Sequence, residues 1–266
     1  MKKLLIPTLT VCAALLAGCA AMSPQGLSHG AAADTPAGAT AGKPVHWGYS
    51  GHAGPEHWAE ISPEFGSCNG KNQSPINLTR FVDAKLAPLN PVYQAGGQSI
   101  INNGHTVQIN YAPGSFITVD GDRYELKQFH FHEPSENHID GKAYPLEMHL
   151  VHADSKGNLA VIAVMFEEGA ENPALDAFWN QLPMEEGPVQ ALKAPVNVAT
   201  LLPTNPGYYR YNGSLTTPPC SEGVRWLVMK TPLTASKAQL AAFAHAMKDS
   251  PDNRPLQPLN ARSVLR

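Results

Sequence analysis

The sequence predicts a mainly β (α+β) fold, with one domain around a largely antiparallel sheet and helices at its margin. Proline and glycine are frequent, with 24 and 22 residues in a chain of 266, and they interrupt it at short intervals. The segments between them are short apolar runs, which are typical of strands. Only two segments combine helical spacing with good helix formers. A strand-rich pattern with few helices favours an antiparallel sheet.

The apolar runs indicate the elements in chain order. Segments 119–122 and 154–158 contain Asp and Gly between two runs and predict hairpin turns. Asn172-Pro173 and Ser236 are N-terminal signals for helices over 174–181 and 236–248. The predicted strands cover residues 99–101, 107–111, 116–119, 124–131, 146–152, 159–166 and 224–233.

The first 44 residues differ in composition from the rest. Two lysines and an apolar stretch over 4–17 predict a secretory signal, too short to span a membrane well. The stretch ends in LAGC at 16–19, which resembles the bacterial lipobox, so residues 1–19 are predicted to be a signal peptide with lipidation at Cys19. A signal peptide cut at residue 20 or 21, without lipid, is the alternative.

The lipid hypothesis predicts where the protein resides. Two or more acyl chains anchor a protein stably to a membrane. Residues 20–44 are almost all Ala, Gly, Ser, Thr and Pro and predict a flexible tether, followed by a globular domain over 45–266. We therefore expect an exported, periplasmic protein held at a membrane through its N-terminal lipid.

Charge and cysteine count narrow the class of protein. A net charge of −3 gives no indication of a nucleic-acid partner. Once the signal segment and Cys19 are set aside, Cys68 and Cys220 remain. An even remainder in an oxidising compartment predicts one disulfide between them, and two unlinked thiols are the alternative.

Two runs with alternating histidines predict a metal site. In an extended strand, Gln128, His130 and His132 share one face, and so do Glu147 and His149. Two neighbouring strands of this kind would bring three imidazoles together. Three imidazoles plus an open position are typical of catalytic zinc, and Gln128 and Glu147 are placed to fix the histidine tautomers. Any single histidine taken alone is more often structural than a ligand.

Eight short blocks stand in a fixed order along the chain: HWGY at 46–49, GPEHW at 54–58, QSPIN at 73–77, NNGH at 102–105, QFHFH at 128–132, PSE at 134–136, EMHLVH at 147–152 and GSLTTPP at 213–219. Together these blocks resemble the α-class carbonic anhydrases. The resemblance covers roughly residues 47–262 and implies one domain around a twisted, mostly antiparallel sheet of about ten strands. The two cysteines and the PSE segment resemble the bacterial, exported branch, for which a homodimer is usual.

The resemblance assigns roles around a Zn²⁺ ion held by His130, His132 and His149. Thr216 resembles the residue that accepts a hydrogen bond from the zinc-bound hydroxide, and Glu136 the residue that accepts from Thr216. Such a relay would fix the orientation of the attacking group before reaction. Thr217 resembles the residue that contacts bicarbonate or inhibitors, and we expect anions and sulfonamides to inhibit. The apolar wall for carbon dioxide is implied to be Val151, Val161, Leu215, Val224 and Trp226.

His105 resembles the proton shuttle of the family. An imidazole that titrates near neutral pH can accept a proton from the site and release it to buffer. The resemblance implies that Tyr49, Asn103 and Gln108 order the intervening waters. From the sequence around it alone, His105 reads as a solvated turn histidine. His152 falls off the inward-facing pattern and is predicted to be structural.

The resemblance implies a zinc lyase that interconverts carbon dioxide and bicarbonate. One departure stands near the C-terminus, where Asp252-Asn253 directly precedes Arg254-Pro255 and one residue of the family pattern is missing. A backbone carbonyl near this point orients the second histidine ligand in the family, and the sequence leaves open whether Asp252 or Asn253 supplies it. A non-catalytic binding module on the same fold and a zinc-storage protein are the alternatives.

Overall fold

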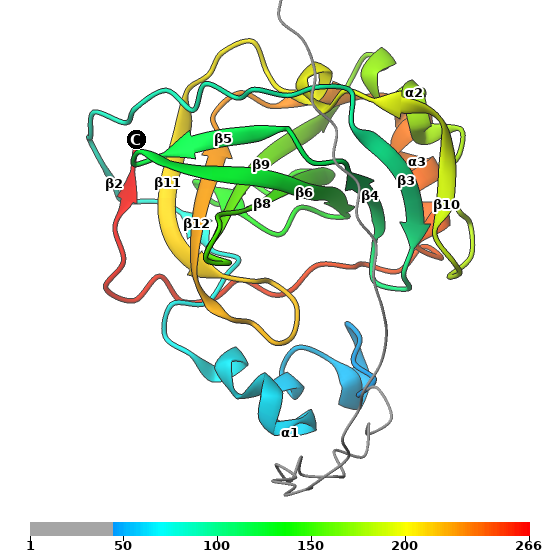
Figure 1. Cartoon of the computed structure of the whole chain (residues 1–266). Coiled ribbons are helices and arrows are strands. Elements are labelled where there is room, and N and C mark those ends of the chain that lie inside the picture. The colour runs from blue at the N-terminus through cyan, green and yellow to red at the C-terminus, as the bar shows by residue number, and fades with distance from the viewer. Residues whose placement is uncertain (1–44) are drawn as a thin grey trace, which may run out of the picture. The chain divides into compact units, whose positions relative to one another are not determined.

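The computed structural model describes residues 45–266. Their main sheet follows the order β10-β3-β4-β6-β8-β9-β12-β11-β14-β2, with β5 paired to β6 and β13 to β9. Figure 1 shows this sheet from β10 on the right to β2 on the left. The strands are β2 Phe81–Val82, β3 Gly97–Asn102, β4 Val107–Tyr111, β5 Phe116–Val119, β6 Asp122–His132, β8 Leu146–Ala153, β9 Leu159–Glu168, β10 Gln190–Val196, β11 Tyr208–Ser214, β12 Glu222–Met229, β13 Leu233–Ala235 and β14 Val264–Leu265.

Most neighbouring strands run antiparallel. The parallel pairs of the main sheet are β9 with β12, β9 with β13, and β14 with β2. Two short strands, β1 (Asn77–Leu78) and β7 (His138–Ile139), form a separate parallel pair. The predicted fold class, a mainly β domain with a mostly antiparallel sheet of about ten strands, is confirmed.

The strand predictions hold wherever the apolar pattern is strong. The predicted strand 224–233 is wrong in one respect, because it is two strands, β12 and β13, separated around Pro232. Proline has no N–H to donate to a ladder. Two strands of seven residues were missed: β10 is mostly exposed and contains Pro195, and β11 mixes tyrosines with polar residues.

Both predicted hairpin turns are present. Asp120 and Gly121 have positive φ values of 55° and 89° between the paired residues Val119 and Asp122. Such a two-residue turn matches the twist of its strands. In the 154–158 turn, Asp154 N–H donates to the Asn158 carbonyl over 2.9 Å.

A break in alternation along β6 sets which residues face the site. The register shifts between Leu126 and Gln128. Leu126 and Phe129 consequently both lie in the larger apolar core. Gln128 and His130 face the other side, toward the second core of the sheet, which contains Val161 and Trp226. The extra residue of the bulge thus shifts the alternation, so that Leu126 and Phe129 share the apolar face while Gln128 and His130 share the face of the candidate site.

The larger core is covered by α2 (Pro173–Trp179), α3 (Lys237–Ala246) and the 3₁₀ helix η3 (Val198–Leu201). The helix α1 (Trp58–Ile61) and the 3₁₀ helix η2 (Pro63–Asn69) pack in a separate small cluster with Cys220, and the 3₁₀ helix η1 (Gly51–Ala53) precedes them in the chain. The predicted start signals of α2 and α3 are confirmed, since Asn172 caps α2 and Ser236 forms a capping box with Gln239. No helix within residues 45–266 is long and apolar enough to cross a membrane. The predicted signal, tether and Cys19 lie outside the described residues.

Candidate metal centre and active site

Neighbouring strands bring three histidines to one point. In the register of β6 and β8, His130 lies directly opposite His149, and His132 lies opposite Glu147. One ring nitrogen from each of His130, His132 and His149 lies within 4.8 Å of the others. His132 and His149 are each only 1% exposed. The predicted grouping of the three imidazoles is therefore present in the structure.

Each ring has a polar neighbour at its far nitrogen, which is a hydrogen-bond acceptor for His130 and His132 and a nearby carboxylate for His149. His130 Nδ1 donates to Gln128 Oε1 over 2.8 Å, and His132 Nδ1 donates to the Asp252 carbonyl over 2.7 Å. His149 Nε2 lies 3.0 Å from Glu147 Oε1. These partners leave His130 Nε2, His132 Nε2 and His149 Nδ1 for the centre. The carbonyl that the sequence left open belongs to Asp252.

The residues fit a zinc ion. His132 Nε2 is buried and has no hydrogen-bond partner among the described residues. Burial, together with His132 and His149, holds the pKa of His130 well below its usual value, which favours the neutral imidazole that metals bind. Three imidazoles and an open fourth position are the donor set of catalytic zinc, for which carbonic anhydrase is the standard example.

Glu147 is a buried carboxylate with a full set of partners. It accepts from Asn137 N–H and from Asn137 Nδ2, both over 2.8 Å. Burial alone would raise the pKa of Glu147, but His149 and the hydrogen bonds from Asn137 lower it. The carboxylate is thus held charged beside the His149 ring. Sequence reasoning missed the role of Asn137. The one feature of the sequence that points to it is its position directly after Glu136.

Glu136 is also buried, at 1% exposed, and its two oxygens differ. Oε1 accepts from the backbone N–H of Arg254 over 2.9 Å. Oε2 lies 3.6 Å from His132 Nε2 and has no hydrogen-bond partner in residues 45–266. Thr216 is 5% exposed, and the hydrogen bonds found among these residues do not include one from Thr216 to Glu136. The relay between them stays a prediction.

Apolar side chains line the same face of the sheet. The Trp226 ring lies 4.8 Å from the His149 ring, edge-on, and its Nε1 donates to the Ser214 carbonyl. The second core of the sheet contains the predicted wall residues, with Val161, Val224 and Trp226 buried and Val151 and Leu215 partly buried. Thr217 is partly exposed in the loop after β11, where its carbonyl accepts from Cys220 N–H over 2.9 Å.

His105 lies in a turn between β3 and β4. Its ring stacks on Trp47 with 3.7 Å between centroids, and Tyr49 lies edge-on at 6.5 Å. Asn103 Oδ1 accepts from the backbone N–H groups of His105 and Thr106, so Asn103 fixes the turn. His105 is half-buried beside a hollow of about 580 Å³.

Tyr49 and Gln108 are the other two residues predicted to order waters. The Tyr49 hydroxyl is buried without a partner among the described residues. Burial, followed by the charges of Glu136 and Asp252, raises the pKa of Tyr49. Gln108 lies opposite His130 across β4 and β6. Gln108 is thus a cross-strand neighbour of one histidine of the centre, and the roles of Tyr49 and Gln108 in ordering water stay predictions.

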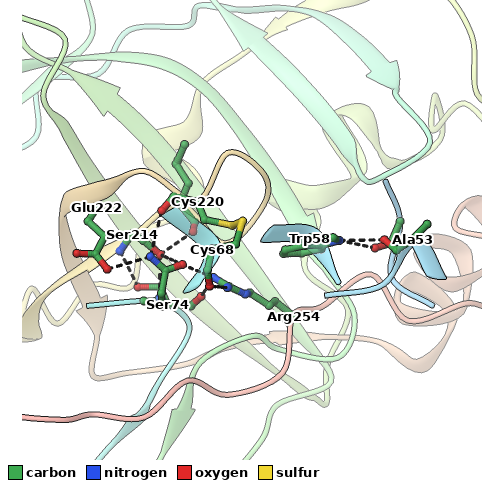
Figure 2. The surroundings of a disulfide bond; sticks show 11 residues. Ala53, Trp58, Cys68, Ser74, Ser214, Cys220, Glu222 and Arg254 are labelled. Atoms are coloured by element: carbon green, nitrogen blue, oxygen red, sulfur yellow. Dashed lines mark hydrogen bonds between the residues drawn. A yellow bond between two sulfur atoms is a disulfide. The ribbon is translucent and has the colours of Figure 1, made fainter. Parts of the chain in front are cut away.

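The predicted disulfide joins Cys68 to Cys220. Figure 2 shows it near Arg254, with Ser74 and Ser214 to its left. Cys220 follows the loop that carries Thr216 and Thr217, and Cys68 lies in η2, so the bond ties that loop to η2. A disulfide between these two residues fits an exported, oxidising compartment.

Arg254 is the second residue that sequence reasoning missed. It is 2% exposed, and its guanidinium donates to Gln73 Oε1, to the Ser74 carbonyl and to the Cys68 carbonyl over 2.8, 2.9 and 3.0 Å. Gln73 Nε2 in turn donates to the Cys220 carbonyl over 3.1 Å. Arg254 therefore connects both half-cystines to Glu136.

Comparison with known proteins gives a consistent result. The family described as eukaryotic-type carbonic anhydrase matches residues 53–266. A carbonic anhydrase of Pectobacterium carotovorum is 50% identical over 228 residues, covering 85% of this chain and 93% of that protein. The solved α-carbonic anhydrase of Thermovibrio ammonificans, in complex with the inhibitor sulfanilamide, is 50% identical, with a TM-score of 0.82 over 84% of this chain and 99% of its own. That of Photobacterium profundum is also 50% identical, with a TM-score of 0.79 over 83% and 100%.

The fold and the site together define a β-sheet zinc enzyme with three histidine ligands. The chain belongs to the α-carbonic anhydrase family. Its activity is the reversible hydration of carbon dioxide, and its cofactor is zinc.

Proposed function

We propose that this carbonic anhydrase holds carbon dioxide against the wall of Val151, Val161, Leu215, Val224 and Trp226 and exports the proton through His105. The observation that carries the proposal is the convergence of three imidazole nitrogens, each ring oriented by its own partner. When bound, zinc lowers the pKa of a water in the site to about 7, a value for which carbonic anhydrase itself is the standard example.

Thr216 and Glu136 orient the attacking water in this proposal. The free oxygen of Glu136 accepts from the Thr216 hydroxyl, which leaves the Thr216 oxygen to accept from the water. That water then presents a lone pair to the carbon of carbon dioxide. Support comes from the burial of Glu136 and Thr216 and from the absence of another partner for Glu136 Oε2 among the described residues. Fixed orientation of this kind lowers the activation barrier, because the reacting groups are already aligned.

His105 carries the proton out of the site. The proton reaches it through waters between Tyr49, Asn103 and Gln108, and the imidazolium then releases it to buffer. Support comes from the half-buried position of His105 beside an open hollow.

Inhibitor binding, anchoring and assembly complete the proposal. Thr217, at the rim of the site, contacts bicarbonate and inhibitors, so anions and sulfonamides block this chain as sulfanilamide does its relative. The protein is periplasmic, anchored through a lipid on Cys19, and a homodimer. Mass spectrometry of the mature protein from membranes tests the anchor. We expect an acylated Cys19 as first residue, whereas an unmodified N-terminus at residue 20 or beyond would exclude it.

The test of the catalytic proposal is stopped-flow carbon dioxide hydration by the purified protein, with zinc content measured on the same sample. We expect about one zinc per chain and fast hydration that chelation abolishes and added zinc restores. His105→Ala keeps its zinc and loses rate mainly at low buffer concentration, because external buffer replaces the shuttle. Full zinc without hydration would contradict the catalytic assignment, and a full rate for His105→Ala at low buffer would contradict the shuttle.

A further inference from the structure

The turn that carries His105 is tied to a second surface segment, residues 183–187. The Asn102 carbonyl accepts from Gly187 N–H over 3.1 Å. The buried Asn102 side chain donates to the carbonyls of Pro183 and Ala246 over 3.1 and 3.0 Å, and its Oδ1 accepts from Gly104 N–H. Segment 183–187 is therefore held in a fixed position beside the turn.

This position brings the Glu186 carboxylate against the turn. Gly104 has a φ of +82°, and a Cβ atom added to it would lie 2.8 Å from Glu186 Oε2. Glycine thus allows the carboxylate to approach the backbone next to His105. The neighbouring Glu185 is paired with Lys248 over 2.9 Å. Glu186 has no ion pair within residues 45–266, so its charge is not neutralised by direct contact.

Several groups act on the His105 imidazole. Burial lowers the pKa of His105, the Glu186 carboxylate opposes this shift, and His46 adds to it. The Tyr49 ring faces His105 edge-on, and Glu56 and Asp252 lie further along the same hollow. Of these groups, Glu186 is the carboxylate whose charge acts on His105.

We infer that Glu186 is a positioning residue for proton export, which makes His105 a better acceptor of the proton that leaves the site. The inference rests on the proposed shuttle role of His105. The step breaks one O–H bond of the water held in the site and forms one N–H bond on the imidazole, while each water of the hollow accepts one proton and passes one on. The imidazolium then returns the proton to buffer. Proton transfer is most efficient when the two pKa values are close. A carboxylate that favours the imidazolium brings the acceptor closer to a donor with a pKa near 7.

The inference predicts unequal effects on the two directions of the reaction. In Glu186→Gln, His105 becomes a weaker base, so hydration at low buffer slows while dehydration at low buffer does not. An exposed charge interaction shifts a pKa by a few tenths of a unit. We therefore expect the pKa of His105, measured by NMR titration, to fall by about 0.2 to 0.7 units. Low-buffer hydration should fall by up to about threefold, because the rate of proton transfer follows the pKa of the acceptor but changes by less than the full shift.

The matched control is Glu185→Gln, which removes the adjacent carboxylate and leaves Glu186 in place. We expect it to leave the pKa of His105 and both low-buffer rates unchanged. Glu186→Asp keeps a carboxylate at this position and should therefore have a His105 pKa and low-buffer rates close to those of the wild type. The inference is overturned if Glu186→Gln behaves like the control, or if hydration and dehydration fall equally, as a distorted turn would cause.

His105→Ala separates this inference from the proposal on which it rests. A full low-buffer rate for His105→Ala would overturn the shuttle role and the inference with it. A slow His105→Ala beside an unaffected Glu186→Gln would overturn the role of Glu186 alone.

Discussion

The backbone N–H of Arg254 donates to Glu136 Oε1 over 2.9 Å, and thereby joins a buried cation to the candidate active site. The Arg254 guanidinium lies on the other side of this link, where it donates to the carbonyl of Cys68. Glu136 is consequently held by the same residue that holds the disulfide region.

Arg254→Met is expected to destabilise the protein by about 3 kcal/mol, because it leaves buried acceptors without a donor. The acceptors include the carbonyls of Cys68 and Ser74. The measurement is urea unfolding at neutral pH. Arg210→Met is the matched control, since Arg210 pairs with the exposed Asp120 and such pairs contribute at most about 1 kcal/mol. Equal losses in the two variants would show that the buried network contributes nothing.

The double variant Cys68→Ser/Cys220→Ser is expected to lose about 5 kcal/mol of unfolding free energy in the chain-entropy description. The bond closes a loop with a sequence separation of 152. The measurement compares urea unfolding of the variant and the wild type, each with and without a reductant. A reductant should destabilise the wild type alone, and equal stability of the oxidised wild type and the variant would refute the expectation.

His149→Ala is expected to abolish zinc binding and hydration together, since it removes one of three ligands. Glu147→Gln keeps the ligand but loses the charge beside His149 Nε2, and should weaken zinc affinity about 10- to 100-fold. Zinc content and competition with a chelator measure both effects. His138→Ala, outside the three-histidine group, serves as the control and should keep its zinc.

Thr216→Val is expected to lower kcat/KM by about 10²-fold without loss of zinc, because it preserves shape but removes the hydroxyl that orients the water. Thr118→Val in β5 is the control for a Thr-to-Val change on an exposed strand position. Hydration rates and zinc content on the same samples provide the measurement. An unchanged kcat/KM in Thr216→Val would rule out the relay with Glu136.

The buried side chain of His152 should make the free energy of unfolding fall at acidic pH. It is fully buried, as its predicted structural role requires, and lies 2.7 Å from the Tyr93 hydroxyl. Burial lowers the pKa of His152 to about 4, whereas the unfolded chain binds this proton near pH 6.5. The unfolded state therefore binds more protons as pH falls from about 6.5 to 4, and stability is lost across that window.

His152→Gln should remove this dependence. Between pH 7 and pH 5 the His152 contribution to the unfolding free energy falls by about 2 kcal/mol. The drop on going from pH 7 to pH 5 should therefore be smaller by that amount in His152→Gln than in the wild type. Urea unfolding of both proteins at both pH values measures it, and parallel losses would assign the acid sensitivity to other groups.

The sequence predicts the parts of the site that depend on local pattern. The alternation around His130 and His149 places both rings on one face, and the strong apolar runs define the central strands. It does not reveal the register shift near Lys127, because a bulge leaves no apolar signature. Nor does it predict the Asp252 carbonyl or the Arg254 network, since both depend on contacts between segments far apart in the chain.

The hydrogen bond from His132 to Asp252 has a consequence for the order of folding, since it joins residues 120 positions apart. A chain that ends before Asp252 would contain all three ligands and still lack the group that orients one of them. Contacts between distant residues form late, because the entropy of closing a long loop opposes them. We therefore expect tight metal uptake to follow the docking of the segment that contains Asp252.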